Sequence, residues 1–407
     1  MIYLSKGLRA ALFAAALGFS LNLYALNGAQ LIGFSATTAS MGGAGAAAAP
    51  QEGSVMITNP AGLTEISRGV SFNFLLGFPR SQANTTAATL GNTVGNQVSN
   101  DDPVILPSGN VVLPFLDDRL HVGVGAFQIA GFGNDYARSP AAPGTTGNNY
   151  STHSLYGLLK IVTAAAYEYN EKLSIGLGIH VNQQQLESNS AVLPTLTQTT
   201  GIDRSDRSFG AGVGVGILYK LSDLIHLGAS YTSEQFMNEF SRYQDLFPRG
   251  LNYPQQANIG AAFYPIEGLL AAADFRWINW SGAHGGFGDA QNAAGNGGLG
   301  WQDQFIGMVG AQYQLLSNLK LRSGFNFSRS AVPSRAAFTN VLSTAVAKYH
   351  LGGGFSFEPI KDILLDFSYL RTVNSTKTDN GAHSALGTGA VIAASGHEFN
   401  FGLGVRF

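Results

Sequence analysis

Residues 399–407, at the end of the chain, read FNFGLGVRF. Large apolar side chains stand at every second position, and the residues between them are polar or small. Side chains in a β-strand point alternately to opposite faces, so this stretch has one apolar face and one polar face. A membrane-spanning barrel strand needs that division, because one face meets lipid and the other faces the lumen. The stretch therefore predicts a transmembrane β-strand.

The same alternation recurs upstream, and no helical period of 3.6 residues accounts for it. A soluble all-β protein would collect its aromatic residues on the buried face and its charges on the exposed face. Here the second face consists mainly of Gly, Ser, Asn and isolated charges, which favours a membrane barrel. The clearest segments are 173–181, 211–219, 225–231, 271–277, 319–327, 349–357 and 363–369.

The connections between these segments alternate in length, with six short turns and seven long polar loops. Short periplasmic turns and long extracellular loops are typical of outer-membrane barrels. Residues 69–407 are thus predicted to form an all-β, 14-stranded antiparallel transmembrane barrel. The turns fall at 117–118, 170–171, 222–223, 265–268, 317–318 and 359–362, and the loops at 79–102, 131–152, 188–206, 235–254, 281–301, 330–346 and 373–395.

Composition supports a membrane barrel and excludes other classes. Charged residues make up only 12% of the chain, about half the usual share. A helical membrane protein would need apolar runs of about 20 residues. The absence of cysteine excludes disulfides and thiolate chemistry, and a net charge of −2 without a basic run gives no reason to expect nucleic acid as a partner.

The first 25 residues have the layout of a secretory signal peptide. Lys6 and Arg9 precede the apolar stretch 10–21, and Ala25 is a small residue at a plausible cleavage point. A membrane anchor is the alternative, but the apolar core is too short for it. We therefore expect cleavage after Ala25 and export to the outer membrane of a Gram-negative bacterium, where a non-helical chain must close into a barrel. The terminal Phe407 resembles the signature that barrel-assembly machinery recognises.

Residues 26–68 precede the first predicted strand and do not fit a simple porin. They contain the small-residue run MGGAGA at 41–46 and the sequence NPAGL at 59–63. Small residues allow two backbones to approach closely. The segment is therefore expected to fold compactly inside the barrel.

This segment, together with AFQIAGFGNDY at 126–136 and DFRWINW at 274–280, resembles the FadL/TodX family of outer-membrane transporters. The resemblance covers essentially the whole chain after the signal peptide. It implies a monomeric barrel whose lumen is blocked by residues 26–68, a hatch. The hatch motif is carried by Asn59, Pro60, Ala61, Gly62 and Leu63.

The resemblance also implies a function, the transport of hydrophobic small molecules, above all long-chain fatty acids. Monoaromatic hydrocarbons such as toluene are the alternative cargo. The implied route runs from extracellular loops to an apolar pocket and then sideways through a kink in the third strand. Gly131, Phe132 and Gly133 match that kink, and Gln128 breaks the alternation before them. An ordinary strand end is the alternative explanation.

One predicted extracellular loop carries an aromatic stripe. Phe236, Phe240, Tyr243 and Phe247 stand at i, i+4, i+7 and i+11, which is the spacing of an amphipathic helix, with Leu246 beside them. Such a stripe is either the groove that captures ligand or the surface that packs the loop onto its neighbours. The two roles are compatible.

Five cations are predicted to face the lumen, where one of them would pair with a ligand carboxylate. The alternative is an ion-pair network between wall and hatch, with Asp274, Glu168 and Asp366 as partners. The cations are Lys160, Arg276, Lys320, Arg322 and Lys348.

No cofactor, metal site or enzymatic activity is expected from this sequence. The eight His residues lack metal-binding spacing, and no Gly-x-Ser-x-Gly elbow is present. Two other functions remain open. A barrel hydrolase would need a Ser and a His meeting on one wall, and a hydrophilic porin would need an open lumen.

Overall fold

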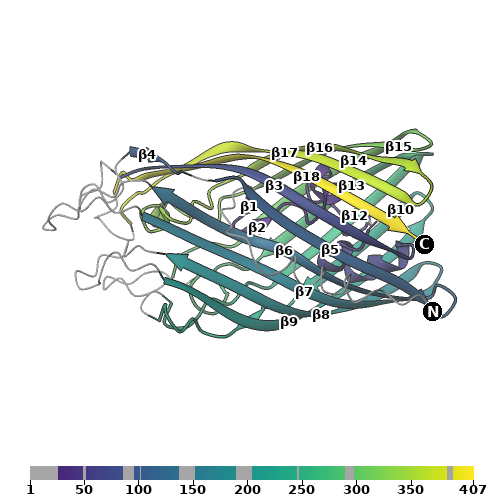
Figure 1. Ribbon diagram of the computed structural model, residues 1–407, viewed down its shortest axis with the longest axis horizontal. Helices are drawn as coiled ribbons and strands as arrows, with labels where there is room; N and C mark the ends of the chain where they lie inside the picture. Colours follow the sequence, from purple (N-terminus) through teal and green to yellow (C-terminus); the bar gives the residue numbers. More distant parts are fainter. Residues whose placement is uncertain are drawn as a thin grey trace, which may run out of the picture.

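The computed structural model describes residues 26–48, 52–85, 96–100, 102–136, 152–188, 204–244, 247–288, 298–382 and 388–407. In these residues, fourteen long antiparallel strands form a closed barrel (Figure 1), as predicted. They are β3 (Gly69–Asn84), β5 (Val104–Phe115), β6 (Leu120–Tyr136), β7 (Thr152–Asn170), β8 (Leu173–Ser188), β9 (Arg204–Ser222), β10 (Ile225–Thr232), β12 (Gln256–Ile266), β13 (Leu269–Ile278), β14 (Gln304–Leu316), β15 (Leu319–Ser328), β16 (Tyr349–Ile360), β17 (Ile363–Thr378) and β18 (Val391–Arg406).

The barrel closes where the last strand meets the first. β18 pairs with β3 along its whole length, from Val391 opposite Asn84 to Arg406 opposite Gly69. The shorter elements are β1 (Leu26–Asn27), β2 (Gln30–Leu31), β4 (Asn96–Val98), β11 (Phe236–Met237), α2 (Ala36–Ser40), α3 (Val55–Thr58), η1 (Pro60–Glu65), η2 (Ser334–Ala336) and η3 (Phe338–Asn340).

The outer face of the wall is apolar and the inner face is polar or small, as the alternation predicts. Phe74 of β3 lies outside against Phe401 of β18, with ring centroids 6.4 Å apart. The neighbouring positions Asn73 and Asn400 are buried and face inward. The described residues contain no helix that is both long enough and apolar enough to span a membrane.

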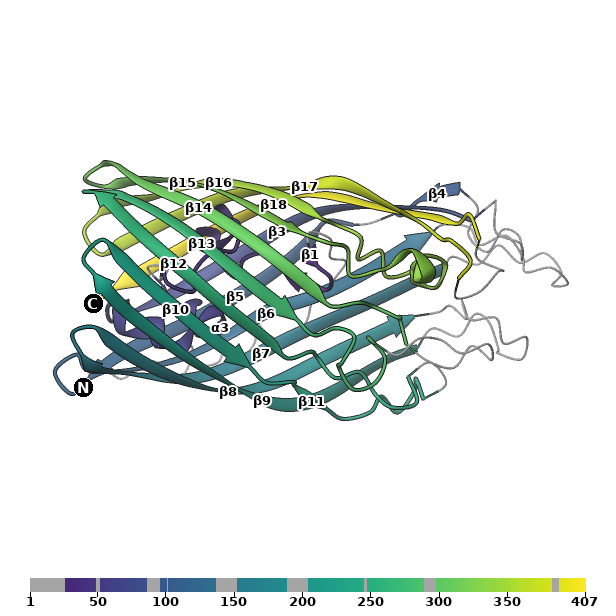
Figure 2. The same cartoon turned by 180° about the vertical axis from the view of Figure 1, so that it is seen from behind.

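All short turns lie at one end of the barrel and the long connections at the other (Figure 2). The strands are longer than expected at the long-loop end. β3, β6 and β17 continue to Asn84, Tyr136 and Thr378, inside segments predicted as loops. The physical reason is that inter-strand hydrogen bonds persist where the apolar alternation has already stopped.

The N-terminal segment, described as residues 26–48 and 52–68, lies inside the barrel (Figures 1 and 2). Residues 26–48 are all buried. The Asp274 carboxylate of β13 accepts hydrogen bonds from the N–H groups of Gly45, at 2.9 Å, and Ala46, at 2.8 Å. The wall strands carry glycine at positions that face the N-terminal segment. A Cβ at Gly228 would collide with the Ala46 carbonyl. Small wall residues thus let the segment lie directly on the strands.

Candidate functional site

The hydrogen-bonded wall is interrupted between β5 and β6. The β5–β6 ladder begins at Phe115 opposite Leu120 and ends at Gly109 opposite Ala126. Beyond that point β5 still pairs with β3 as far as Val104, and β6 still pairs with β7 as far as Tyr136. The described residues therefore form no β5–β6 ladder between 104–108 and 127–134, and we call this break in the wall pairing the lateral opening. Beyond it, Ser99 and Asn100 hydrogen-bond to Asp135 of β6.

A β-bulge in β6 lies close to the point where the β5–β6 ladder ends, at one end of the lateral opening. The register with β7 shifts between Gln128 and Ala130, so Ile129 is an extra residue. From Ile129 to Asn134 the residues of both faces are buried, as are residues 154–160 of the paired strand β7. The edge of β6 that has left β5 pairs with the N-terminal segment inside the barrel, with Ala130 opposite Gln30. β6 therefore turns toward the lumen here, and a bulge is a common cause of such a bend. Gly131 donates its N–H to the carbonyl of Ala29 in the N-terminal segment, at 2.9 Å.

The bulge lies just before the residues to which the sequence assigns the kink. Gly131, Phe132 and Gly133 follow it in the inward-turned part of β6 and pair regularly with Gly157, Tyr156 and Leu155 of β7. The bend requires one unpaired extra residue, and the apolar Ile129 supplies it without glycine. The facing part of β5 contains Pro107, which lacks an N–H and is tolerated at a sheet edge.

Six buried aromatic rings fill the lumen beside the inward-turned part of β6. Phe132 stacks on Tyr156, with centroids 5.0 Å apart, and contacts Trp301 at 5.7 Å. Two of the rings, Trp280 and Trp301, flank the connection between β13 and β14. This aromatic cluster consists of Phe132, Tyr156, Tyr253, Trp280, Phe287 and Trp301.

The polar tips of the aromatic cluster bond to amide side chains, and the ring faces turn toward one another. Trp280 donates to Gln304 at 3.0 Å, and Trp301 donates to Asn340 at 2.7 Å. Tyr253 donates to Gln30 of the N-terminal segment at 3.0 Å. The interior of the cluster is thus apolar, and the polar atoms at the edges of these rings have hydrogen-bond partners. Sequence reasoning missed it, although two of the three tryptophans flank a single loop.

Lys160, one of the five predicted lumen cations, is buried away from any carboxylate of the described residues. It is 1% exposed and lies opposite Phe127, next to the bulge. Its Nζ is 3.4 Å from His180 Nδ1, and Asn182 stands across from it on β8. Among the described residues no carboxylate forms an ion pair with it. Burial without a counter-ion disfavours the charged form of a lysine, and an anion beside it would stabilise that form, so the position is suited to an incoming anion.

The other four cations occupy different surroundings. Arg322 lies 3.7 Å from the Asp366 carboxylate and donates to Gln312 at 2.7 Å, so it belongs to a wall network. Arg276 is buried on β13 two positions from Asp274. Lys320 and Lys348 are only partly buried.

The predicted aromatic stripe does not form one surface. Phe240 and Tyr243 are buried against each other, and the Tyr243 hydroxyl accepts the Ser188 N–H at 2.8 Å. Phe236 belongs to β11 and is 67% exposed, while Phe247 is partly buried. Leu246 lies outside the described residues. The described part of 235–254 contains no helix, and these aromatic residues lie against β8 and β9.

The hatch motif forms a compact, bonded turn. The Asn59 amide donates to the carbonyls of Ala46, at 2.7 Å, and Ile217, at 3.0 Å. Its oxygen accepts the Ala61 N–H at 3.1 Å, which caps η1 at Pro60. Gly62 continues η1, and Leu63 is fully buried.

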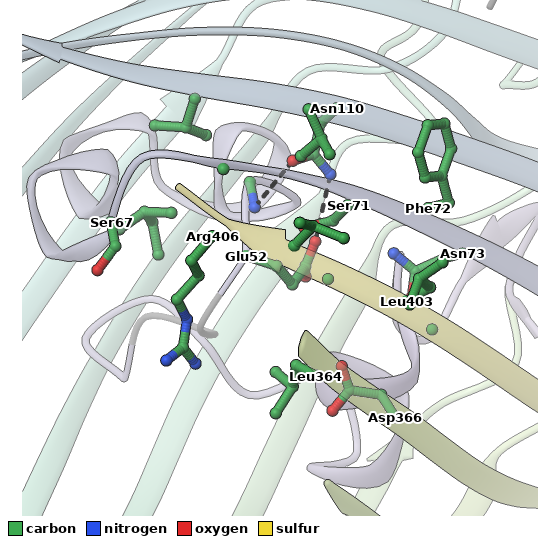
Figure 3. A pocket seen from close by; sticks show the side chains of 18 of the residues that line it. Glu52, Ser67, Ser71, Phe72, Asn73, Asn110, Leu364, Asp366, Leu403 and Arg406 are labelled. Atoms are coloured by element: carbon green, nitrogen blue, oxygen red, sulfur yellow. Dashed lines mark hydrogen bonds between the residues drawn. The ribbon is translucent and has the colours of Figure 1, made fainter. Parts of the chain in front are cut away.

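A cavity of about 120 Å³, lined by both polar and apolar side chains, lies between the N-terminal segment and β3, β5, β17 and β18 (Figure 3). Glu52 accepts hydrogen bonds there from Ser54 and, at 3.3 Å, from Asn110. Burial raises the pKa of the Glu52 carboxyl, although the bonds from Ser54 oppose that shift. The cavity is smaller than a typical ligand pocket and does not accommodate a long alkyl chain. No cluster of three or more metal-ligating residues occurs in the described part of the chain.

Replacing Glu52 by Gln is expected to hold the N-terminal segment more firmly at neutral pH. Because the pKa of Glu52 is raised when the N-terminal segment is docked, the protonated carboxyl stabilises docking fully at pH values below its ordinary pKa of 4.5. This stabilisation is lost as the pH rises through the raised pKa of the docked carboxyl. Wild-type hydrogen exchange in residues 52–58 should therefore quicken across that window, and the E52Q profile should stay flat. The control is E65Q, which removes a partly exposed ion pair with Lys220. Identical profiles for wild type and E52Q would assign the pH response elsewhere.

No curated protein matches the sequence, but solved structures share the fold. The toluene transporter TodX of Pseudomonas putida has a TM-score of 0.70 at 17% identity, covering 93% of this chain and 99% of that one. TbuX, the toluene transporter of Ralstonia pickettii, has a TM-score of 0.66 at 20% identity over the same shares. A FadL homologue of Pseudomonas aeruginosa has 0.68 at 15%, covering 93% and 100%. Residues 22–407 match the model described as outer membrane protein transport protein (OMPP1/FadL/TodX), and the chain belongs to this family.

Proposed function

We propose that this chain carries long-chain fatty acids across the outer membrane and releases them sideways through the lateral opening. The observation that carries the proposal is the end of the β5–β6 ladder at Ala126, next to Lys160, with Phe132 of the aromatic cluster further along β6. A strand that turns into the lumen connects an internal apolar site with the outer surface of the wall. Such a path suits a molecule that is soluble in lipid and poorly soluble in water.

The proposed route begins at the extracellular loops, where the exposed Phe236 offers an apolar contact. It continues to the aromatic cluster, whose rings must part to admit an alkyl chain. Burying 14 methylenes is worth about 11 kcal/mol, at about 0.8 kcal/mol each. A rigid pocket would therefore release ligand slowly. Movement of the N-terminal segment, which contacts the cluster through Gln30, would weaken the site and let the ligand leave.

Lys160 favours a fatty acid over a hydrocarbon as the cargo. Tyr156 and Lys160 lie on the same face of β7, about 13 Å apart at 3.3 Å per residue. A carboxylate at Lys160 thus leaves the alkyl chain free to reach the aromatic cluster. The aromatic cluster by itself also fits a monoaromatic hydrocarbon, the second candidate, which has no group to pair with the buried ammonium.

Replacing Lys160 by Met is expected to weaken oleate binding by about tenfold or more, since the ion pair is lost in a buried site. Affinities for oleate, oleyl alcohol and toluene are to be measured by competition with the purified protein. Wild type should prefer oleate to oleyl alcohol, and K160M should lose that preference while keeping its toluene affinity. K348M, another predicted lumen cation, is the control. Equal oleate binding by wild type and K160M would remove Lys160 from the ligand site.

We also propose that residues 26–68 act as a hatch and that residues 1–25, which lie outside the described part, are removed as a signal peptide. Two observations support the division, namely the burial of the N-terminal segment and the start of the wall at Gly69. The chain is proposed to work as a monomer in outer-membrane lipid. Phe407, exposed at the end of β18, is proposed to be read by the barrel-assembly machinery.

A further inference from the structure

Four polar side chains interrupt the apolar outer face of β17, β18 and β3. Arg371 stands directly opposite His397, and His397 stands opposite Phe78. Phe78 is an exposed outer-face residue, and Arg80 lies two positions further along the same face. Tyr369 lies two positions from Arg371. The three adjacent strands thus place Tyr369, Arg371, His397 and Arg80 side by side, and we call them the basic cluster.

Hydrogen bonds within the basic cluster hold Tyr369, His397 and Arg371 in a defined arrangement. The Tyr369 hydroxyl lies 2.7 Å from His397 Nδ1, and an Arg371 Nη1 bonds to His397 Nε2. A guanidinium can only donate, so Nε2 is the acceptor and Nδ1 carries the proton toward Tyr369. His397 is neutral in this arrangement. Arg371 Nη1 also donates to the Gly396 carbonyl, at 3.5 Å. A guanidinium carries five N–H donors, so Arg371 has donors left for a second acceptor.

The position of the basic cluster along the strands places it at the edge of the apolar band. Toward the short-turn end the outer face is aromatic, with Phe74 and Phe401 centroids 6.4 Å apart. β18 runs from His397 to Arg406 in ten residues, and about 9–11 strand residues cross a bilayer. Since Arg406 lies at the short-turn end, the basic cluster stands at the membrane surface on the long-loop side.

No acidic side chain balances this charge on the outer face of the three strands. β3, β17 and β18 are described in full, and their only acidic residues are Asp366 and Glu398. Both are buried on the lumen face. The basic cluster is therefore an uncompensated positive site next to the head groups of the outer leaflet.

We propose that the basic cluster binds the phosphate of an outer-leaflet glycolipid, the phosphorylated lipid A of the Gram-negative outer membrane. Arginine pairs with phosphate through paired N–H donors, and Tyr369 supplies a further polar contact. The aromatic face below, with Phe78 and Phe399, would accept the acyl chains of the same molecule. Binding would fix one lipid at the seam where β18 closes onto β3.

The test measures lipid A adducts of the purified full-length chain by native mass spectrometry, with R80Q/R371Q as the variant. We expect adduct formation to fall about tenfold, because two charged contacts are lost. The control, K172Q/K361Q, makes the same charge change on exposed lysines of the short turns and should bind like wild type. Heat-resistant migration of each variant verifies that the barrel is folded.

Further measurements separate the lipid phosphate from other causes. Dephosphorylated lipid A should bind wild type as weakly as intact lipid A binds R80Q/R371Q, and inorganic phosphate should not displace the lipid. Equal binding of intact and dephosphorylated lipid A, or equal binding by variant and wild type, would overturn the proposal. Complete displacement by inorganic phosphate would also overturn it, since the site would then be one for free anions.

Discussion

Deleting Ile129 is expected to reduce fatty-acid uptake by at least about tenfold while leaving the barrel inserted. Ile129 is the extra residue between Gln128 and Ala130, which pair with the consecutive Leu159 and Leu158 of β7. Without it, β6 can pair with β7 in continuous register and lie flat in the wall. The β5–β6 ladder would then extend past Ala126 and close the lateral opening. Uptake of labelled oleate by cells with equal surface levels of the protein measures the effect.

The matched control removes a bulge that lies away from the lateral opening. β17 carries one extra residue between Thr372 and Ser375, which pair with Gly396 and Ala394 of β18. Deletion of the exposed Asn374 should therefore leave uptake close to the wild-type rate. If the Ile129 deletion transports oleate as fast as wild type, release through the lateral opening is wrong and the ligand leaves by another route.

Replacing Asn59 by Ala should free the N-terminal segment inside an otherwise intact barrel. The change removes three hydrogen bonds, to Ala46, Ile217 and Ala61. Each buried polar group left unpaired costs about 1–3 kcal/mol. The wall ladder does not depend on these bonds, so the barrel should still resist heat. We expect slower oleate uptake and a raised leak of small polar solutes, measured as channel conductance in planar bilayers.

A second substitution at Asn59 separates the contributions of its two side-chain atoms. Asn59→Asp keeps the acceptor for the Ala61 N–H but loses both donor bonds to the carbonyls. If the bonds to Ala46 and Ile217 hold the segment, the Asp variant should leak like the Ala variant. Normal uptake without added conductance in both variants would mean that gating does not depend on this turn.

The local sequence predicted the positions and conformations of some residues of the proposed transport route and not of others. Gln128 marks the lapse of alternation in the third strand, so an irregularity there was predictable. Its position at Ile129 was not, because an extra residue is defined only against the register of β7. Phe236, Phe240 and Tyr243 have helical spacing, but contacts with Ala211 and Ser188 on other strands decide their conformation.

The five lumen cations illustrate the same difference. Sequence offered the same two roles for the whole group, pairing with a ligand carboxylate or an ion-pair network between wall and hatch. Asp366 pairs with Arg322 from a different strand, whereas no carboxylate in the described residues pairs with Lys160. The partner of a buried charge is set by contacts between strands and loops that are distant in sequence.

The sequence by itself determined the number of strands, their antiparallel order and the places of the short turns. Lipid on one face and a polar lumen on the other impose a two-residue period that each strand carries independently. Only the tertiary structure decided where β6 leaves β5 and which rings meet. Phe132 and Trp301 are brought together by barrel closure and by the loop between β13 and β14. The energies of those contacts depend on pairs of distant residues, and a pattern read along one strand does not contain them.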